Sequence, residues 1–157
     1  MTLDEKTIET VAIAISIAAG CEPCTKFHAK AARKLGATDL EMMHIVALAG
    51  SNWSESNAFT AAINEIVTMP SRGDDAYSLT HNAVLARVGV SVCRNCVRLL
   101  QVSMEVAQEQ GVADEELMTV IALAARIKQK AAAHLDRVID RLDVDDSIGH
   151  EAASLCV

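Results

Sequence analysis

The sequence predicts an all-α fold, and three observations lead to this expectation. Apolar residues recur at helical spacing through most of the chain, whereas no stretch alternates between apolar and polar residues as a strand would. Hydrophobic residues make up 51% of the 157 residues but aromatic residues only 3%, so the core must consist mainly of aliphatic side chains. A CxxC pair followed by a helical stretch and a glycine also occurs twice, which indicates two related helical units.

The first helix is predicted to begin with a capping box, because Thr2 and Glu5 have the required spacing, and to end at Gly20. Its apolar residues lie almost all round the helix between Ile8 and Ile17. A helix that is apolar on every side is buried, so this segment is expected at the centre of the core.

Two further helices are expected to follow in the same unit. One begins at the first CxxC pair, where Pro23 suits a first helical turn, and ends before Gly36. The next begins at Thr38, which forms a second capping box with Glu41, and it ends near Gly50. Its side chains predicted to point inward are Ile45, Val46 and Leu48.

Residues 70–75, PSRGDD, form the clearest boundary in the chain because proline and glycine interrupt helices. We therefore assign 1–70 to a first unit, 76–142 to a second unit packed in the same domain, and 143–157 to an acidic C-terminal tail. The remaining helices are expected at 54–69, 76–90, 93–110 and 114–142.

The two units also match in detail. The sequence GATDLEMMHIVALA follows the helix after CEPC, and GVADEELMTVIALA follows the helix after CRNC. Gly36 thus matches Gly111, and Glu41 matches Glu116. If the two CxxC pairs are aligned as well, the second copy has three extra residues between its pair and its glycine.

The first CxxC pair is the strongest candidate for chemistry. Cys21 and Cys24 lie at the first turn of a predicted helix, where they can close a disulfide and where free N–H groups favour a thiolate. His28 follows Cys24 by four residues and so lies one turn further along the same face. It can accept the proton of Cys24, which makes Cys24 the candidate for the activated thiol and Cys21 the resolving or partner-contacting one.

Glu9 is the fourth candidate, because a carboxylate on an otherwise apolar helix needs a partner. The first two helices should form an antiparallel hairpin about Gly20. At roughly 1.5 Å per residue, Glu9 lies about 16 Å and His28 about 12 Å from this turn. At these depths the carboxylate can meet the imidazole across the hairpin, orient it and raise its basicity.

The second pair, Cys93 and Cys96, has no evident base. When the CxxC pairs are aligned, the position of the glutamate is taken by His81 and the position of the histidine by Leu100. Cys93 and Cys96 are therefore either a second redox pair or a pair packed in the core. Cys156 lies at the end of the acidic tail and its role is open.

Composition argues against several other functions. The net charge is −7 and no basic cluster occurs, so a nucleic-acid partner is not expected. The apolar run 11–19 is too short to span a bilayer, and the first charged residues are acidic, so neither a membrane span nor a signal peptide is expected. The protein is therefore expected in the cytoplasm, where cysteines rarely serve as structural disulfides.

Residues 3–50 resemble the alkylhydroperoxidase D-like branch of the carboxymuconolactone decarboxylase family. An A-x-x-G-A-T-x-x-E pattern over 32–41 also matches, and a weaker likeness extends over 80–142. The main shared motif is a glutamate, eleven intervening residues and CxxCxxxH, here Glu9, Cys21, Cys24 and His28.

This resemblance implies an all-helical homo-oligomer, a trimer or hexamer, with peroxidase or disulfide-reductase activity and with no metal or other cofactor. It implies that Glu9 and His28 deprotonate Cys24, which reduces a hydroperoxide or a partner protein's disulfide, and that Cys21 then closes the disulfide. A dithiol or a redox protein would restore the thiols. The intact CxxC pair favours this redox branch over the decarboxylase branch.

Two alternatives stay open. The first is a lyase that decarboxylates a small lactone, in which Glu9 and His28 carry out acid–base chemistry and the thiols are not needed. The second is a non-enzymatic module, either a redox sensor or a zinc-holding protein in which the two CxxC pairs form one site with four cysteine ligands.

Overall fold

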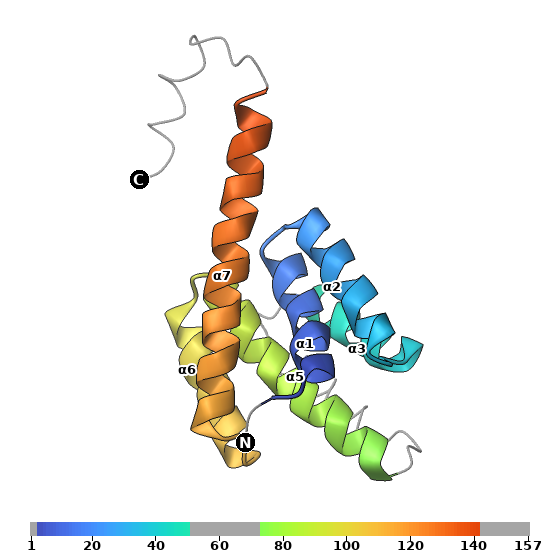
Figure 1. The fold of residues 1–157 in the computed structure, drawn as a ribbon. Helices are drawn as coiled ribbons and strands as arrows, with labels where there is room; N and C mark the ends of the chain where they lie inside the picture. The colour runs from blue at the N-terminus through green and yellow to red at the C-terminus, as the bar shows by residue number, and fades with distance from the viewer. Residues whose placement is uncertain (1–2, 51–72, 142–157) are drawn as a thin grey trace.

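A computed structural model describes residues 3–50 and 73–141, which form six α-helices and, within these ranges, no strand (Figure 1). The helices are α1 Glu5–Ala18, α2 Glu22–Lys34, α3 Asp39–Gly50, α5 Gly73–Cys93, α6 Val97–Glu109 and α7 Asp114–Ile139. The all-α prediction is confirmed for this part of the chain. The helix expected at 54–69 and the tail 143–157 with Cys156 lie outside the described residues.

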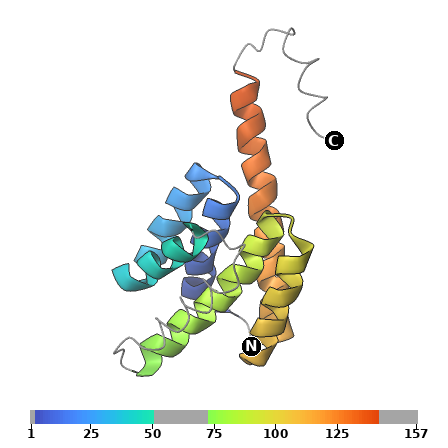
Figure 2. The same ribbon diagram turned by 180° about the vertical axis from the view of Figure 1, so that it is seen from behind.

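Helix α1 lies at the centre of the fold and contacts α2, α3, α5 and α7. In Figures 1 and 2, the α2–α3 pair and the α6–α7 pair lie on opposite sides of the molecule, with α1 and α5 between them. Every residue from Thr10 to Ser16 is buried, as expected for a helix that is apolar on all sides. The core is aliphatic as predicted, and its largest fully buried side chains include Ile13, Ile15, Ile45, Leu85 and Leu117.

The N-terminus of α1 differs from the sequence prediction. The helix begins at Glu5, and Asp4 is the N-cap residue because its side chain accepts a hydrogen bond from the amide of Thr7 at 2.7 Å. The predicted capping box of Thr2 with Glu5 is therefore wrong, and Thr2 itself lies outside the described residues. The C-terminal end is as predicted, since Gly20 adopts a left-handed φ of 67° just after the helix.

The ends of α2 and α3 are close to the predictions. Pro23 lies in the first turn of α2. Thr38 and Glu41 form the predicted capping box before α3: the amide of Thr38 donates to the Glu41 carboxylate at 2.6 Å, and the amide of Glu41 donates to the Thr38 hydroxyl at 3.2 Å.

The inward face of α3 is partly different from the prediction. Ile45 and Leu48 are buried, but Val46 is 47% exposed and Ala49 is buried instead. Positions three and four residues apart share one face of a helix, and Val46 lies a quarter turn away from the face formed by the other three.

Helices α1–α3 and α5–α7 match at a constant step of 75 positions, the step from Gly36 to Gly111. Adding this step to the bounds of α2, 22–34, reproduces the bounds of α6, 97–109. It also carries the last residue of α1 to the last residue of α5 and the first residue of α3 to the first residue of α7. The insertion of three residues that the CxxC alignment required is absent from the backbone.

The turn between α5 and α6 explains the difference. Asn95 has a left-handed φ of 54° and takes the place of Gly20, so α5 continues to Cys93 and α6 begins only after Cys96. The expected helices at 76–90 and 93–110 are corrected accordingly, and α5 begins at Gly73, inside the expected boundary 70–75. The turn hydrogen bonds also match: the amide of Cys21 donates to the carbonyl of Ser16 at 3.0 Å, and the amide of Cys96 donates to the carbonyl of Ser91 at 3.3 Å.

Gly89 lets α5 lie unusually close to α1 and α7. A Cβ atom at this position would lie 2.5 Å from Cδ1 and 2.6 Å from Cγ1 of Ile15, and 3.3 Å from Cγ1 of Val120. Both neighbours are fully buried β-branched side chains, so they have little freedom to move away. The glycine therefore determines how tightly the three helices pack.

Helix α7 is the longest, with 26 residues, and its C-terminal half extends beyond the other helices in both ribbon views (Figures 1 and 2). Its exposed large apolar side chains in this half are Leu135, Val138 and Ile139. Within 3–50 and 73–141, no helix has the length and apolar character needed to cross a membrane.

Candidate thiol redox site

The predicted cysteine pair lies at the beginning of α2. Cys21 and Cys24 are joined by a disulfide, with their Cα atoms 5.3 Å apart, so the structure describes the oxidised form. Cys21 is the N-cap residue of α2, and its sulfur accepts a hydrogen bond from the amide of Cys24 at 3.3 Å. Both residues are buried, Cys21 with 3% and Cys24 with 7% of its surface exposed.

His28 and Glu9 meet across the α1–α2 hairpin, as the depth argument predicts. His28 Nδ1 lies 2.7 Å from Glu9 Oε2, and the two side chains are only 14% and 22% exposed. An ionised carboxylate can only accept, so Nδ1 donates the hydrogen bond. In the neutral imidazole this leaves Nε2 as the nitrogen that can accept a proton.

The hairpin therefore brings together all four residues of the predicted site. Cys24 and His28 are four residues apart on α2, and Glu9 reaches His28 from α1. The ring of Phe27 packs edge-on against His28 with 5.2 Å between the ring centres. From the start of α2 to its contact with α1, the order of these groups is therefore Cys24, His28 and Glu9.

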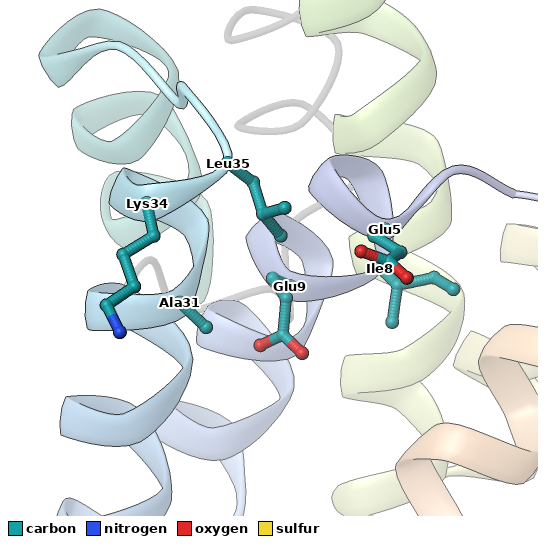
Figure 3. A pocket seen from close by; sticks show the side chains of 6 residues that line it. All are labelled: Glu5, Ile8, Glu9, Ala31, Lys34 and Leu35. Atoms are coloured by element: carbon teal, nitrogen blue, oxygen red, sulfur yellow. The ribbon is translucent and has the colours of Figure 1, made fainter.

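A groove of about 340 Å³ opens beside Glu9. Figure 3 shows its six lining side chains, which come from the first half of α1 and from the end of α2. They are Glu5, Ile8, Glu9, Ala31, Lys34 and Leu35. Glu9 therefore takes part both in this groove and in the contact with His28.

The second CxxC pair has a different geometry. Cys93 ends α5 and is buried, with its sulfur 3.8 Å from the carbonyl oxygen of Ala124, whereas Cys96 is exposed. Both are free thiols. Burial raises the pKa of Cys93 to about 11, and the charge of Lys128 opposes this shift only in part.

The constant step of 75 positions corrects the residue correspondences taken from the CxxC alignment. Neither His81 nor Leu100 takes the place that was predicted for it. The residues that match Glu9, Cys21, Cys24 and His28 are Val84, Cys96, Leu99 and Ser103. One cysteine of the first site is thus retained in the second hairpin, while the base, the carboxylate and the other cysteine are not.

His81 instead matches Lys6, which forms an ion pair with Glu41 at 2.7 Å. His81 lies 3.6 Å from Glu116 in the same way, so each half has a basic residue on its first helix that faces a glutamate in the first turn of its third helix. Although burial acts to raise it, hydrogen bonds from Lys6 and Thr38 lower the pKa of Glu41. Sequence reasoning missed this contact, although the matched glycines and glutamates already have the 75-residue spacing that reveals it.

No cluster of three or more histidine, cysteine, aspartate or glutamate residues suited to a metal ion occurs within 3–50 and 73–141.

Residues 2–65 match the model of the carboxymuconolactone decarboxylase family. For this segment the resemblance is confirmed at the level of the family. The match covers α1, α2 and α3 with all four residues of the candidate site, and it does not distinguish the alkylhydroperoxidase D-like branch from the others. No curated protein and no solved structure matches the chain.

Proposed function

We propose that this protein is a thiol-dependent peroxidase of the alkylhydroperoxidase D-like type. Cys21 and Cys24 form its redox pair, and Glu9 and His28 form its proton relay. The observation that carries the proposal is the 2.7 Å contact between Glu9 and His28, one helical turn from the disulfide of a CxxC pair. The match of this segment to a family that includes peroxidase-like members supports it.

The reaction begins from the reduced pair. Cys24 transfers its proton to His28, and the thiolate attacks one oxygen of the hydroperoxide. The O–O bond breaks, the attacked oxygen stays on Cys24 as a sulfenic acid, and the other oxygen takes the proton and leaves as an alcohol. The thiol of Cys21 then attacks the sulfur of Cys24, so that the S–S bond forms and the sulfenic oxygen leaves as water.

Two thiols and one hydroperoxide thus give one disulfide, one alcohol and one water. An external dithiol, or a redox protein once the start of α2 has opened, restores the thiols by thiol–disulfide exchange. Burial of both cysteines favours a small hydroperoxide over a partner protein's disulfide as oxidant, because a second protein could reach these sulfurs only if the start of α2 opened.

We further propose that the two matched halves derive from a duplicated helical unit, and that the protein acts in the cytoplasm as a homo-oligomer, a trimer or a hexamer. Large apolar side chains exposed on separate helices support an oligomer, among them Phe27, Met43, Met118 and Leu135. Light scattering of the purified protein tests this, and a monomer at micromolar concentration would refute it.

A lyase is the second candidate function, and the groove beside Glu9 favours it. This carboxylate lines the groove together with Lys34 and could act there as an acid or a base on a carbonyl compound. Lactone decarboxylation that survives Cys24→Ser would support the lyase and refute the peroxidase.

The peroxidase is tested by counting thiols by intact mass before and after one equivalent of tert-butyl hydroperoxide, with peptide mapping. We expect rapid formation of the Cys21–Cys24 disulfide in the reduced wild type and much slower formation in His28→Ala. If the two thiols stay reduced, or if His28→Ala oxidises at the wild-type rate, the proposed mechanism is wrong.

A further inference from the structure

Ser16 carries a buried hydroxyl group whose role the proton relay above leaves unexplained. The residue is completely buried on α1, and its Oγ atom has no hydrogen-bond partner among the described residues. A hydroxyl that has lost its water and gained no partner destabilises the folded protein, so such a group needs an explanation. It lies close to the thiols, because the carbonyl of Ser16 accepts a hydrogen bond from the amide of Cys21 at 3.0 Å.

The second hairpin shows which way this side chain faces. Ser16 matches Ser91 at the step of 75 positions, and His28 matches Ser103. The hydroxyl oxygens of Ser91 and Ser103 lie 3.2 Å apart across the α5–α6 hairpin. Because α1 and α5 end at matching residues, α2 and α6 have matching bounds and the turn hydrogen bonds also match, Ser16 lies on the side of α1 that faces position 28 of α2.

The same comparison shows that the two serine hydroxyls differ in their hydrogen bonds. Ser91 donates to the carbonyl of Arg87 at 2.7 Å, which is the usual way for a serine inside a helix to satisfy its hydroxyl group. Ser16 makes no such bond in the oxidised form, in which the sulfur of Cys24 is bonded to Cys21. Reduction frees that sulfur next to His28, one turn along α2.

We propose that Ser16 is a positioning residue whose hydroxyl bridges Cys24 Sγ and His28 Nε2 once the Cys21–Cys24 disulfide is reduced. In this bridge the hydroxyl accepts a hydrogen bond from the protonated Nε2 and donates one to the thiolate sulfur. The proton that leaves Cys24 is thereby passed to His28 through Ser16, and the serine gains and loses one proton without net change. This inference rests on the proposed redox function of the pair and adds one residue to its relay.

The bridge exists only in the reduced protein, so it stabilises the dithiol relative to the disulfide. Its loss in Ser16→Ala should make the Cys21–Cys24 disulfide about three- to tenfold harder to reduce, the range that one hydrogen bond supports. The oxidised form of Ser16→Ala should be as stable as the wild type or more stable, because an unsatisfied buried hydroxyl has been removed.

Ser91→Ala is the matched control. It removes a hydroxyl that is already bonded, in the hairpin without a disulfide, so it should lower the melting temperature of both redox forms equally and leave the redox equilibrium unchanged. Ser16→Thr keeps the hydroxyl and should retain the wild-type equilibrium. If the extra methyl group of Ser16→Thr prevents folding, the melting temperatures of Ser16→Ala still test the proposal. The substitution should lower the melting temperature of the reduced form and not that of the oxidised form.

The experiment is equilibration of each variant with glutathione buffers, with the oxidised fraction measured by intact mass, and thermal unfolding of both redox forms. An unchanged equilibrium in Ser16→Ala, or an equal shift in Ser91→Ala, would overturn the proposal. Because the experiment uses no peroxide, it measures the effect of Ser16 on the Cys21–Cys24 redox equilibrium even if the protein is not a peroxidase. If glutathione cannot reduce the wild-type disulfide and a strong dithiol cannot either, both the redox function and the role of Ser16 are refuted.

Discussion

Replacing Glu9 by glutamine tests the proton relay most directly, because the substitution removes the charge and keeps the shape. A hydrogen bond between charged groups contributes about 1.5–3 kcal/mol and a neutral one about 0.5–1.5 kcal/mol, so the imidazolium loses about 1–1.5 kcal/mol of stabilisation. The side chains of His28 and Glu9 are 14% and 22% exposed, so hydration can replace a small part of the lost stabilisation. We therefore expect a loss of about 1 kcal/mol, or roughly fivefold slower oxidation of the thiol pair.

The assay is the rate at which the reduced protein loses two thiols after addition of tert-butyl hydroperoxide at pH 7, followed by intact mass. Glu22→Gln is the control, since it removes the same charge from the first turn of α2. The Glu22 side chain is 77% exposed and paired with the equally exposed Lys26, and its loss should change the rate less than twofold. A rate for Glu9→Gln within twofold of the wild type, in a variant that melts normally, would refute the relay.

Three further predictions concern groups outside the relay. At pH 8 iodoacetamide should modify the exposed Cys96 well before Cys93, because Cys93 is buried and the rise of its pKa from 9.0 to about 11 lowers its ionised fraction about 100-fold, and peptide mapping that finds equal labelling would contradict this. Gly89→Ala should lower the free energy of unfolding by about 1–2 kcal/mol, because overpacking against the buried isoleucine of α1 exceeds the gain in helix propensity, and urea unfolding that shows a gain would contradict it. The lowered pKa of Glu41 means that its bond to Lys6 stabilises the protein above the pKa of the unfolded state and is lost as pH falls through the folded value. Glu41→Gln should therefore be about 1 kcal/mol less stable at pH 7 and approach the wild type as pH falls below the lowered pKa of Glu41 in the folded protein, as measured by urea unfolding at a series of pH values.

The sequence predicted the first hairpin well because its signals are local. The apolar circumference of α1, the turn at Gly20, and the capping box of Thr38 with Glu41 each depend on residues within one or two turns. The contact of Glu9 with His28 was also predictable. In an antiparallel hairpin with a known turn, the depth of each residue follows from its distance in sequence from the turn and the constant helical rise per residue.

The second hairpin was predicted less well because two sequence patterns indicate different alignments of the halves, the CxxC pairs and the spacing of the matched glycines and glutamates. Aligning CRNC with CEPC places the cysteines together, but the backbone is set by which residue adopts the left-handed conformation between the two helices. That residue is Gly20 in the first hairpin and Asn95 in the second. Their identities differ, so the equivalence follows only from the 75-residue spacing of the matched glycines and glutamates, with which the CxxC alignment disagrees. The cap at Asp4 and the exposure of Val46 were missed for a related reason, since several residues satisfied the same pattern and only tertiary packing selects among them.

The alignment of the two CxxC pairs and the alignment of the two sets of helices differ by three residues. The helix alignment shows how a second reactive centre could be built in this chain. Cys96 already occupies the place of Cys21, and Ser91 already occupies the place of Ser16. Only three exchanges, Val84→Glu, Leu99→Cys and Ser103→His, separate the α5–α6 hairpin from the full set of residues in the α1–α2 hairpin. The α5–α6 hairpin can therefore serve as a scaffold for these residues. Introducing them there would test whether the four residues are sufficient for thiol redox activity, whereas substitutions in the first hairpin test only whether each is necessary.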